Sequence, residues 1–199
     1  MTGTGDRPLR ADARRNRELL LAAAVRAFSE NGLDATLDAI AKDAGVGIGT
    51  LYRHFPTREA LIEAAYRNEL AVVCDAVPDL LASLPPAQAT RIWMDRFIDY
   101  MTTKFGMADA LRAVIASGGD PYAHSRDRLV TALEALLQAT AAAGDIRTDV
   151  CADDVLIGLS GVALAAGQPS QREQADRLLD LLMDGLRYRP PATVAEKPS

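Results

Sequence analysis

Cysteine, histidine and aromatic residues are scarce in this chain of 199 residues, and aromatic residues make up 5% of it. The histidines, His54 and His124, belong to no Glu-x-x-His pattern, and no Cys-x-x-Cys pair occurs. Zinc and di-iron sites therefore lack their usual ligands. Acidic residues such as Asp153 and Asp154 stand at expected helix starts, where carboxylates stabilise the helix dipole. We predict no catalytic site, no metal and no cofactor, and hence a protein that is not an enzyme.

Long hydrophobic runs are absent as well. No stretch of 18 apolar residues occurs, and the basic N-terminus lacks the apolar region of a secretory signal. We therefore expect no membrane partner and a cytoplasmic location. Cys74 and Cys151 lie far apart in the sequence, which favours two reduced, buried thiols; a redox-sensing pair is the alternative.

The residues that are abundant favour helices. Hydrophobic residues make up 49% of the chain, Ala and Leu dominate, and runs of β-branched residues are rare. Charge is divided unevenly: residues 1–58 hold nine basic and seven acidic side chains, a formal +2, whereas the whole chain carries −5. This division favours contact between the N-terminal part and a polyanion.

One segment, residues 36–61, has the pattern of a helix-turn-helix. Apolar residues at Leu37, Ile40, Ala41 and Ala44 form one face of a helix about two turns long. The residue before it, Thr36, can accept a hydrogen bond from the first turn. The residue after it, Gly45, suits the left-handed backbone that ends a helix sharply. The pattern predicts a short helix followed by a tight corner.

A second short helix is expected after this corner, with Val46, Leu51 and Phe55 as its buried set. Two glycines near its start would let backbone N–H groups approach a phosphate. Its polar side carries hydroxyl and nitrogen groups suited to phosphate and base-edge contacts, whereas the simpler alternative is a solvated helix face. The glycines and polar residues are Gly47, Gly49, Thr50, Tyr52, Arg53 and His54.

The run AGVGIGTLYRHFPTREALIEA, from Ala44 to Ala64, closely resembles the DNA-binding domain of tetracycline-repressor-like (TetR family) regulators. The resemblance covers about residues 12–65, including the preceding helix with Leu20 and Phe28. It implies an all-α fold with an N-terminal three-helix DNA-binding domain and a C-terminal helical bundle. It also implies that the second helix of the motif docks in the major groove. The residues placed at or near DNA are Thr36, Lys42, Gly47, Ile48, Gly49, Thr50, Tyr52, Arg53, His54 and Arg58.

Ile48 departs from the family pattern, because relatives often have a polar or basic residue there. An isoleucine can pack on a thymine methyl group but cannot hydrogen-bond a base. Specificity would then depend more on Thr50, Arg53 and the segment before the first helix. That segment holds clustered arginines, of which Arg14 and Arg15 are predicted DNA contacts. A solubilising tail is the alternative.

Proline and glycine divide the remainder into further helices, for a total of about nine. We expect helices near 58–77, ended by Pro78; 85–103; a short one after Gly106; 121–143, with Pro121 in its first turn; 153–166; and 170–188. The predicted domains are a flexible basic arm (1–11), a helix-turn-helix domain (12–58), a helical ligand-binding and dimerisation domain (59–189) and a flexible tail (190–199).

The apolar residues of the C-terminal part suit two different roles, a dimer interface and a ligand pocket. Family members dimerise through their last two long helices, which implies an interface at Ile157, Gly161, Leu164, Leu178 and Leu182. Large adaptable side chains elsewhere favour a ligand pocket, although a stripe of this kind can also be ordinary core. The predicted pocket residues are Trp93, Phe97, Tyr100, Met101, Phe105, Met107, Leu111, Tyr122 and His124.

The resulting prediction is a homodimeric transcriptional regulator with three partners: a palindromic double-stranded DNA operator, a second copy of itself and a small-molecule effector. We expect it to act as a repressor and to be released by a small, largely apolar ligand. The alternative is a ligand-independent DNA-binding or protein-interaction module whose C-terminal bundle only dimerises.

Overall fold

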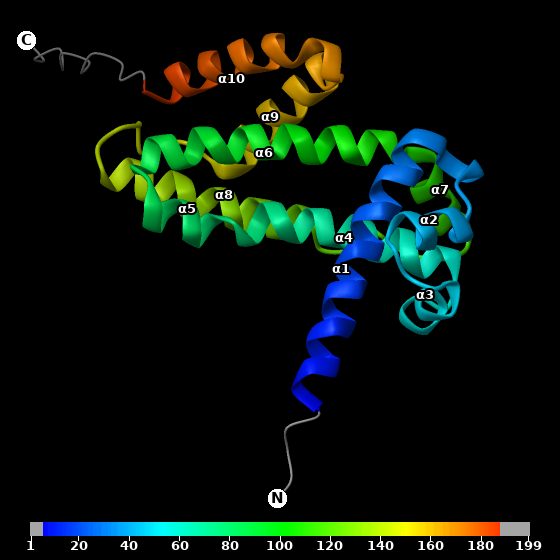
Figure 1. Ribbon diagram of the computed structural model, residues 1–199. Helices are drawn as coiled ribbons and strands as arrows, with labels where there is room; N and C mark the ends of the chain where they lie inside the picture. The colour runs from blue at the N-terminus through cyan, green and yellow to red at the C-terminus, as the bar shows by residue number, and fades with distance from the viewer. Residues whose placement is uncertain (1–5, 188–199) are drawn as a thin grey trace, which may run out of the picture. The chain divides into compact units, whose positions relative to one another are not determined.

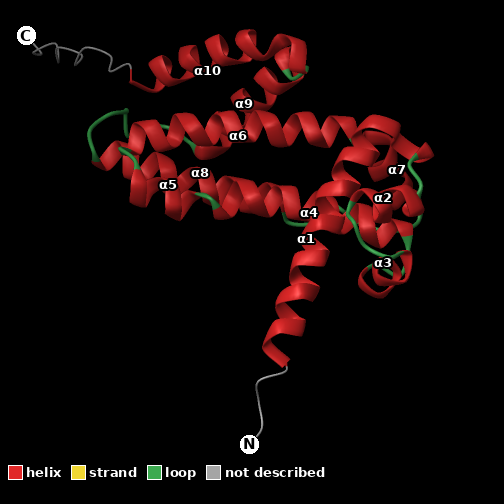
Figure 2. Cartoon of the chain, in the orientation of Figure 1, coloured by secondary structure: helices red, strands yellow, loops and turns green. Residues whose placement is uncertain are grey.

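Helices make up nearly all of residues 6–187, the part of the chain that the computed structural model describes, and no strand occurs there (Figure 1, Figure 2). The all-α prediction is therefore confirmed, with ten α-helices in this range where about nine were expected. None of these helices is long and apolar enough to cross a membrane. The elements are α1 (Asp6–Asn31), η1 (Gly32–Asp34), α2 (Leu37–Asp43), α3 (Ile48–His54), α4 (Arg58–Asp75), α5 (Val77–Ser83), α6 (Pro86–Gly106), α7 (Ala108–Ala116), α8 (Ser125–Ala142), α9 (Ala152–Ala166), η2 (Pro169–Gln171) and α10 (Arg172–Arg187).

Two prolines occupy other positions relative to the helix ends than the sequence predicted. The helix expected to run to Val77 ends at Asp75, and Pro78 lies in the first turn of α5 instead of ending α4. Proline suits that position because the first turn of a helix leaves its N–H groups unpaired in any case. The helix expected from Pro121 begins at Ser125, because residues 121–124 form a turn in which His124 has a φ of 60°.

The described chain divides into two compact units, which do not follow the predicted boundary at residue 58. The first unit contains the chain up to Val73 together with Asp99–Arg126, and the second contains Cys74–Ile98 and the chain from Asp127 onward. The first unit thus includes the helix-turn-helix and also α7. The predicted arm, residues 1–11, overlaps α1, which begins at Asp6; residues 1–5 and the predicted tail at 190–199 lie outside the described residues.

In the first unit, α1 packs on α2 and α3 through a buried apolar set. Phe28, Ile40 and Leu51 come from three different helices, and each is completely buried. Burying a side chain of this size stabilises the folded state by about 1.5–3 kcal/mol. Three short or amphipathic helices that would be marginal alone are therefore held together by one shared core.

In the second unit, Trp93 of α6 is completely buried and stacks on Phe97 with ring centroids 5.8 Å apart. The same core contains a paired polar contact, in which the Thr90 and Thr140 hydroxyls lie 2.8 Å apart. Thr140 Oγ1 also donates to the Leu136 carbonyl at 2.7 Å. Because the buried hydroxyls bond one another and a carbonyl, they avoid the cost of unpaired burial.

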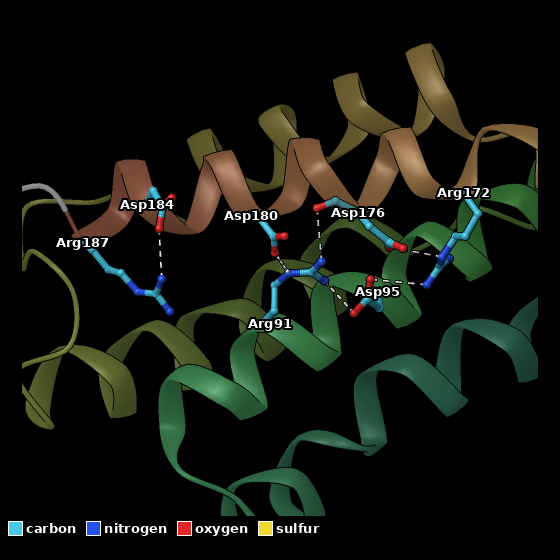
Figure 3. A network of polar contacts seen from close by, with 7 residues as sticks. All are labelled: Arg91, Asp95, Arg172, Asp176, Asp180, Asp184 and Arg187. Carbon is cyan, nitrogen blue, oxygen red and sulfur yellow. Dashed lines mark hydrogen bonds and ion pairs between the residues drawn. The ribbon is translucent and has the colours of Figure 1, made fainter.

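An ion-pair network joins α6 to α10 within the second unit (Figure 3). At its centre the Arg91 guanidinium lies 2.6 Å from the Asp95 carboxylate and donates from Nε to Asp180 at 2.8 Å. It also donates to the main-chain carbonyl of Asp176 at 3.2 Å. Burial lowers the pKa of Arg91, but the hydrogen bonds to Asp95 and Asp180 outweigh it and raise the pKa above its usual value. Arg172 extends the network by pairing with Asp95 and Asp176.

The two cysteines differ from each other in environment. Cys74 is half-buried, and burial raises the pKa of its thiol to about 11. Cys151, in contrast, is exposed directly before α9, so the prediction of two buried thiols was wrong for this residue.

Replacing Arg91 should destabilise the protein, because α10 would lose the Arg91 contacts at Asp176 and Asp180 and keep only the longer Arg172–Asp95 pair to α6. We expect Arg91→Ala to lower the free energy of unfolding by about 1–3 kcal/mol in urea denaturation at a fixed protein concentration. The matched control is Arg187→Ala, which breaks an exposed pair with Asp184 on α10 itself and should cost less than about 0.5 kcal/mol. Equal effects of the two substitutions would contradict a specific role for Arg91.

Candidate nucleic-acid interface

The helix-turn-helix begins at Thr36, which caps α2. Its hydroxyl oxygen accepts a hydrogen bond from the Ala39 N–H at 3.2 Å, as the sequence pattern predicted. A threonine hydroxyl that accepts in this way keeps its own proton available for an outside acceptor. The side chain is exposed, so an anion at the start of α2 can reach it.

The corner between α2 and α3 is closed by two backbone hydrogen bonds. Gly45 N–H donates to the Lys42 carbonyl at 3.1 Å, and Val46 N–H donates to the Ala41 carbonyl at 3.0 Å. This pair of bonds defines a Schellman motif, which requires a left-handed residue at its centre. Gly45 has a φ of 69°, so the predicted left-handed glycine is confirmed.

Helix α3 presents one buried and one open face. Leu51 and Phe55 are buried, whereas 51% of Tyr52 is exposed. A β-carbon added at Gly47 or at Gly49 would meet no other atom within 4 Å, and neither glycine has a positive φ. Neither backbone conformation nor packing within the chain therefore requires glycine at these two positions.

The polar side chains of α3 lie on the open face. Arg53 is folded back along its own helix, donating from Nε to the Gly49 carbonyl and from Nη2 to Thr50 Oγ1, each at 3.2 Å. Both contacts are exposed, so a better acceptor can replace them at little cost. His54 and Ile48 are half-buried, and Lys42 is exposed in the last turn of α2.

Arg58, the first residue of α4, faces inward and has three partners in the first unit. Its guanidinium donates to the carbonyls of Ala35 at 2.5 Å and Leu33 at 2.8 Å, and it lies 5.0 Å from the centre of the Phe28 ring. These contacts hold the chain between α1 and α2, directly before Thr36. The sequence pattern had placed Arg58 only at the DNA backbone, because nothing local indicates these distant carbonyls.

The predicted arginines before the helix-turn-helix lie on α1. Arg14 pairs with Glu18 at 3.6 Å, and both side chains are exposed, as is Arg15. Arg17 lies over the Phe55 ring at 5.6 Å from its centre. Together with α4, Arg17 also borders a groove of about 370 Å³ whose lining includes Ala60, Ala64 and Ala71, a feature that sequence reasoning missed.

The predicted pocket residues do not gather in one unit. Trp93 and Phe97 belong to the second unit and the other seven to the first. Tyr100, Met101, Met107 and Leu111 are buried, Phe105 is half-buried, and Tyr122 and His124 are exposed. Among the described residues, no group of three or more His, Cys, Asp or Glu could hold a metal ion.

Sequence reasoning missed Tyr66, Lys104 and Ser125, which lie close to the predicted tyrosines. The Tyr66 and Tyr100 hydroxyls are 2.6 Å apart, and Tyr66 also contacts Ser125 Oγ at 3.3 Å. Long-range contacts of this kind leave no periodic signal in the sequence.

The predicted dimerisation residues lie on the α9–α10 hairpin, and several of them are highly exposed to solvent for apolar residues. The exposed fraction is 58% for Ile157 and 74% for Leu164, and Gly161 is exposed as well. Leu178 and Leu182 are half-buried, and nearby Leu181, which the prediction omitted, is 68% exposed. These residues form an uncovered apolar patch.

Comparison with known protein families gives two matches along the chain. Residues 20–65 match the model described as "Bacterial regulatory proteins, tetR family". Residues 85–188 match a second model, "Transcriptional regulator SbtR-like, C-terminal domain". The second match extends the likeness beyond residue 65, where the sequence had offered no recognisable motif.

Two solved structures of TetR regulators are similar to this chain over most of its length. The solved structure of the TetR transcriptional regulator SCO0520 from Streptomyces coelicolor is 64% identical, with a TM-score of 0.85, and the match covers 87% of this chain and 99% of that one. A TetR transcription regulatory protein from Mycobacterium vanbaalenii is 33% identical, with a TM-score of 0.75 and coverage of 91% and 100%.

A curated relative matches over a shorter range. An HTH-type transcriptional regulator of Staphylococcus aureus is 35% identical over 65 residues, which are 32% of this chain. The match therefore spans about a third of that protein's length, 35%.

Arg58 should contribute to stability, because its removal leaves two main-chain carbonyls without their donors. We expect Arg58→Met to lower the free energy of unfolding by about 1–3 kcal/mol in urea denaturation. Arg53→Met is the matched control, since Arg53 bonds only exposed groups of its own helix, and it should change stability by less than about 0.5 kcal/mol. If both variants unfold like the native protein, the inward contacts of Arg58 are energetically unimportant.

Proposed function

This chain belongs to the tetR family of bacterial regulatory proteins, and we propose that it is a repressor that binds a palindromic DNA operator as a homodimer. We further propose that a small, largely apolar ligand releases it from the operator. On this view it has no catalytic activity and acts in the cytoplasm, where the operator lies. The exposed glycine-rich start of α3 is the observation on which the proposal chiefly depends.

The start of α3 is suited to very close approach by a large partner. Glycine within a helix costs up to about 1 kcal/mol relative to alanine. Gly49 lies within α3, and no internal contact compensates for that cost, because a β-carbon there would point into open space. Gly47 is the N-cap of α3, where glycine is well tolerated, and a β-carbon there would also point into open space. A DNA backbone accounts for Gly49, because a phosphate can then reach the N–H groups at the start of the helix.

The surrounding side chains fit the same docking. Tyr52 and the free proton of the Thr36 hydroxyl would bond phosphates, with Lys42, Arg14 and Arg15 as further cationic contacts. Arg53 and Thr50 would read base edges, and Ile48 would pack on a thymine methyl group. The remaining predicted contacts are Gly47, Gly49 and His54. Arg58 would act differently from the prediction, as a positioning residue that holds the segment ending at Thr36.

The α9–α10 patch supports the homodimer. Gly161 on α9 and Gly185 on α10 lie within helices, where glycine is unfavourable, and a β-carbon at either would meet nothing within 4 Å. Small residues beside exposed Ile157, Leu164 and Leu181 allow another pair of helices to approach closely. Two copies would place two α3 helices on half-sites about one helical turn of DNA apart, which gives the operator its two-fold symmetry.

Release by a ligand requires a site coupled to α3. Most of the predicted pocket residues share a compact unit with the helix-turn-helix, and flexible, buried Met101 and Met107 suit an apolar ligand. A ligand that binds better to a form whose two α3 helices do not fit successive major grooves would weaken operator binding by its coupling free energy.

The docking proposal can be tested with Gly49→Ala on genomic fragments selected by the purified protein. The added methyl group would occupy the space that DNA needs, so anisotropy titrations should show affinity weakened by about tenfold or more. The same substitution should leave the free energy of unfolding unchanged or raise it by up to about 1 kcal/mol.

The salt dependence of DNA binding by the native protein gives a second test of phosphate contacts. Its affinity should fall steeply as salt rises, because bound phosphates release counterions. Undiminished binding by Gly49→Ala would show that α3 does not enter the groove, and failure to select any fragment would contradict the function itself.

The dimer proposal can be tested with Leu164→Glu in α9. A carboxylate in a closely packed interface would be left without a partner, so sedimentation velocity should show a dissociation constant raised at least tenfold, about 1.4 kcal/mol or more. Leu33→Glu is the control, since Leu33 is also an exposed leucine (55%) but lies on η1. A native protein that sediments as a monomer would refute the homodimer.

A further inference from the structure

A groove in the second unit lies beside the end of α10. It has a volume of about 290 Å³ and is lined by one side of α8 and by residues 146–152, which lead into α9. Arg147 belongs to this lining, and its main-chain N–H donates to the Leu186 carbonyl at 2.9 Å. Leu186 is the next-to-last residue of α10, so the chain leaves that helix beside this α8 groove.

The α8 groove is lined by both apolar and polar side chains. Leu137 and Ile146 are buried, whereas Glu134, Gln138 and Thr148 are exposed. None of these three polar side chains has a hydrogen-bond or ion-pair partner among the described residues. With so much of its lining exposed, the groove would leave a small molecule largely in water, whereas typical small-molecule pockets bury about 70–90% of their ligand. A peptide segment, which needs cover on only one side, fits such a groove better.

The segment that follows α10 has a matching composition. Residues 188–199, which lie outside the described part of the chain, read YRPPATVAEKPS. Consecutive prolines such as Pro190 and Pro191 favour the extended polyproline II conformation, which docks into grooves at a low cost in entropy. Apolar residues stand on both sides of the prolines, and Arg189 supplies a cation for the unpaired Glu134 carboxylate.

We propose that residues 188–194 dock in the α8 groove of their own chain, with the prolines against its apolar side chains and Arg189 beside Glu134. In the polyproline II conformation these residues span about 20 Å. The stretch of α8 from Glu134 to Ala141 is only about 10 Å long, so the segment reaches all of the groove. The link through Leu186 keeps the effective concentration of the segment in the millimolar range, and weak contacts are therefore sufficient.

Docking joins the two helices that carry the α9–α10 patch. The segment continues from the end of α10, and the groove includes Cys151 and Ala152 at the start of α9. The Cys151 thiol, which is exposed in the described chain, is then covered. Part of the tail predicted at 190–199 thus has a fixed place, and Cys151 reports whether the groove is occupied. This inference goes beyond DNA binding and does not depend on it.

The first test measures how fast Cys151 reacts with 5,5′-dithiobis-(2-nitrobenzoate) in the full-length Cys74→Ser protein, where it is the only thiol. Replacing Pro190 and Pro191 together by glycine should raise this rate about threefold or more, because a covered thiol reacts only while it is open. Pro198→Gly is the matched control, since it removes a proline outside the docked segment and should leave the rate unchanged. Thermal melting establishes that each variant folds, and equal rates in all three proteins would overturn the inference.

A cross-link identifies the chain that supplies the segment. In the Cys74→Ser background, Ala192→Cys should form a disulfide with Cys151 of the same chain when oxidised with copper phenanthroline, because a disulfide requires Cα atoms about 4.4–6.8 Å apart. The control moves the acceptor out of the groove by combining Cys151→Ser with Ala143→Cys, an exposed position in the same connection. We expect the control to cross-link at least about tenfold more slowly. Equal rates at the two positions, or a disulfide between two chains, would contradict docking within one chain.

Discussion

The inward-facing guanidinium of Arg58 is the contact on which the geometry of the DNA-reading head depends. Its two hydrogen bonds to the carbonyls of Leu33 and Ala35 fix the short segment that links α1 to α2, while its central carbon lies over the Phe28 ring, 5.0 Å from the ring centre. Among the cationic side chains, arginine has the planar set of donors that can satisfy two carbonyls while its charge lies over an aromatic ring. Because the next residue after this segment is the cap Thr36, the placement of α2 and the corner at Gly45 both follow from it.

Glycine has two different uses in this fold. At Gly45 the backbone itself requires it, because a positive φ completes the Schellman motif at the corner. At Gly49 and Gly161 the backbone is ordinary and the missing side chain faces open space. Glycines of the second kind reduce helix stability, and no contact within the chain requires them. This is the physical reason for proposing that DNA approaches at Gly49 and a second copy at Gly161.

The sequence allowed the helical class, the Thr36 cap, the Gly45 corner and the buried face of α3 to be predicted, because each depends on residues within one or two helical turns. Prediction was weaker at Pro78 and Pro121. A proline is compatible both with the end of one helix and with the first turn of the next, and the choice between them depends on packing. Cys151 was expected to be buried on the basis of residue type alone, and its position before α9 leaves it exposed instead.

The amino-acid sequence by itself determined that a helix-turn-helix lies at residues 36–61 and that α9 and α10 carry excess apolar surface, since these are properties of local spacing. Tertiary structure decided which side chains meet across long separations: Arg58 with Leu33, Arg91 with Asp180, and Tyr66 with Tyr100 and Ser125. It also placed the end of α10 beside the α8 groove, through the hydrogen bond from Arg147 to Leu186. Hydrogen bonds and ion pairs depend on a few tenths of an ångström between atoms far apart in the chain, and no periodicity of residue types records such distances.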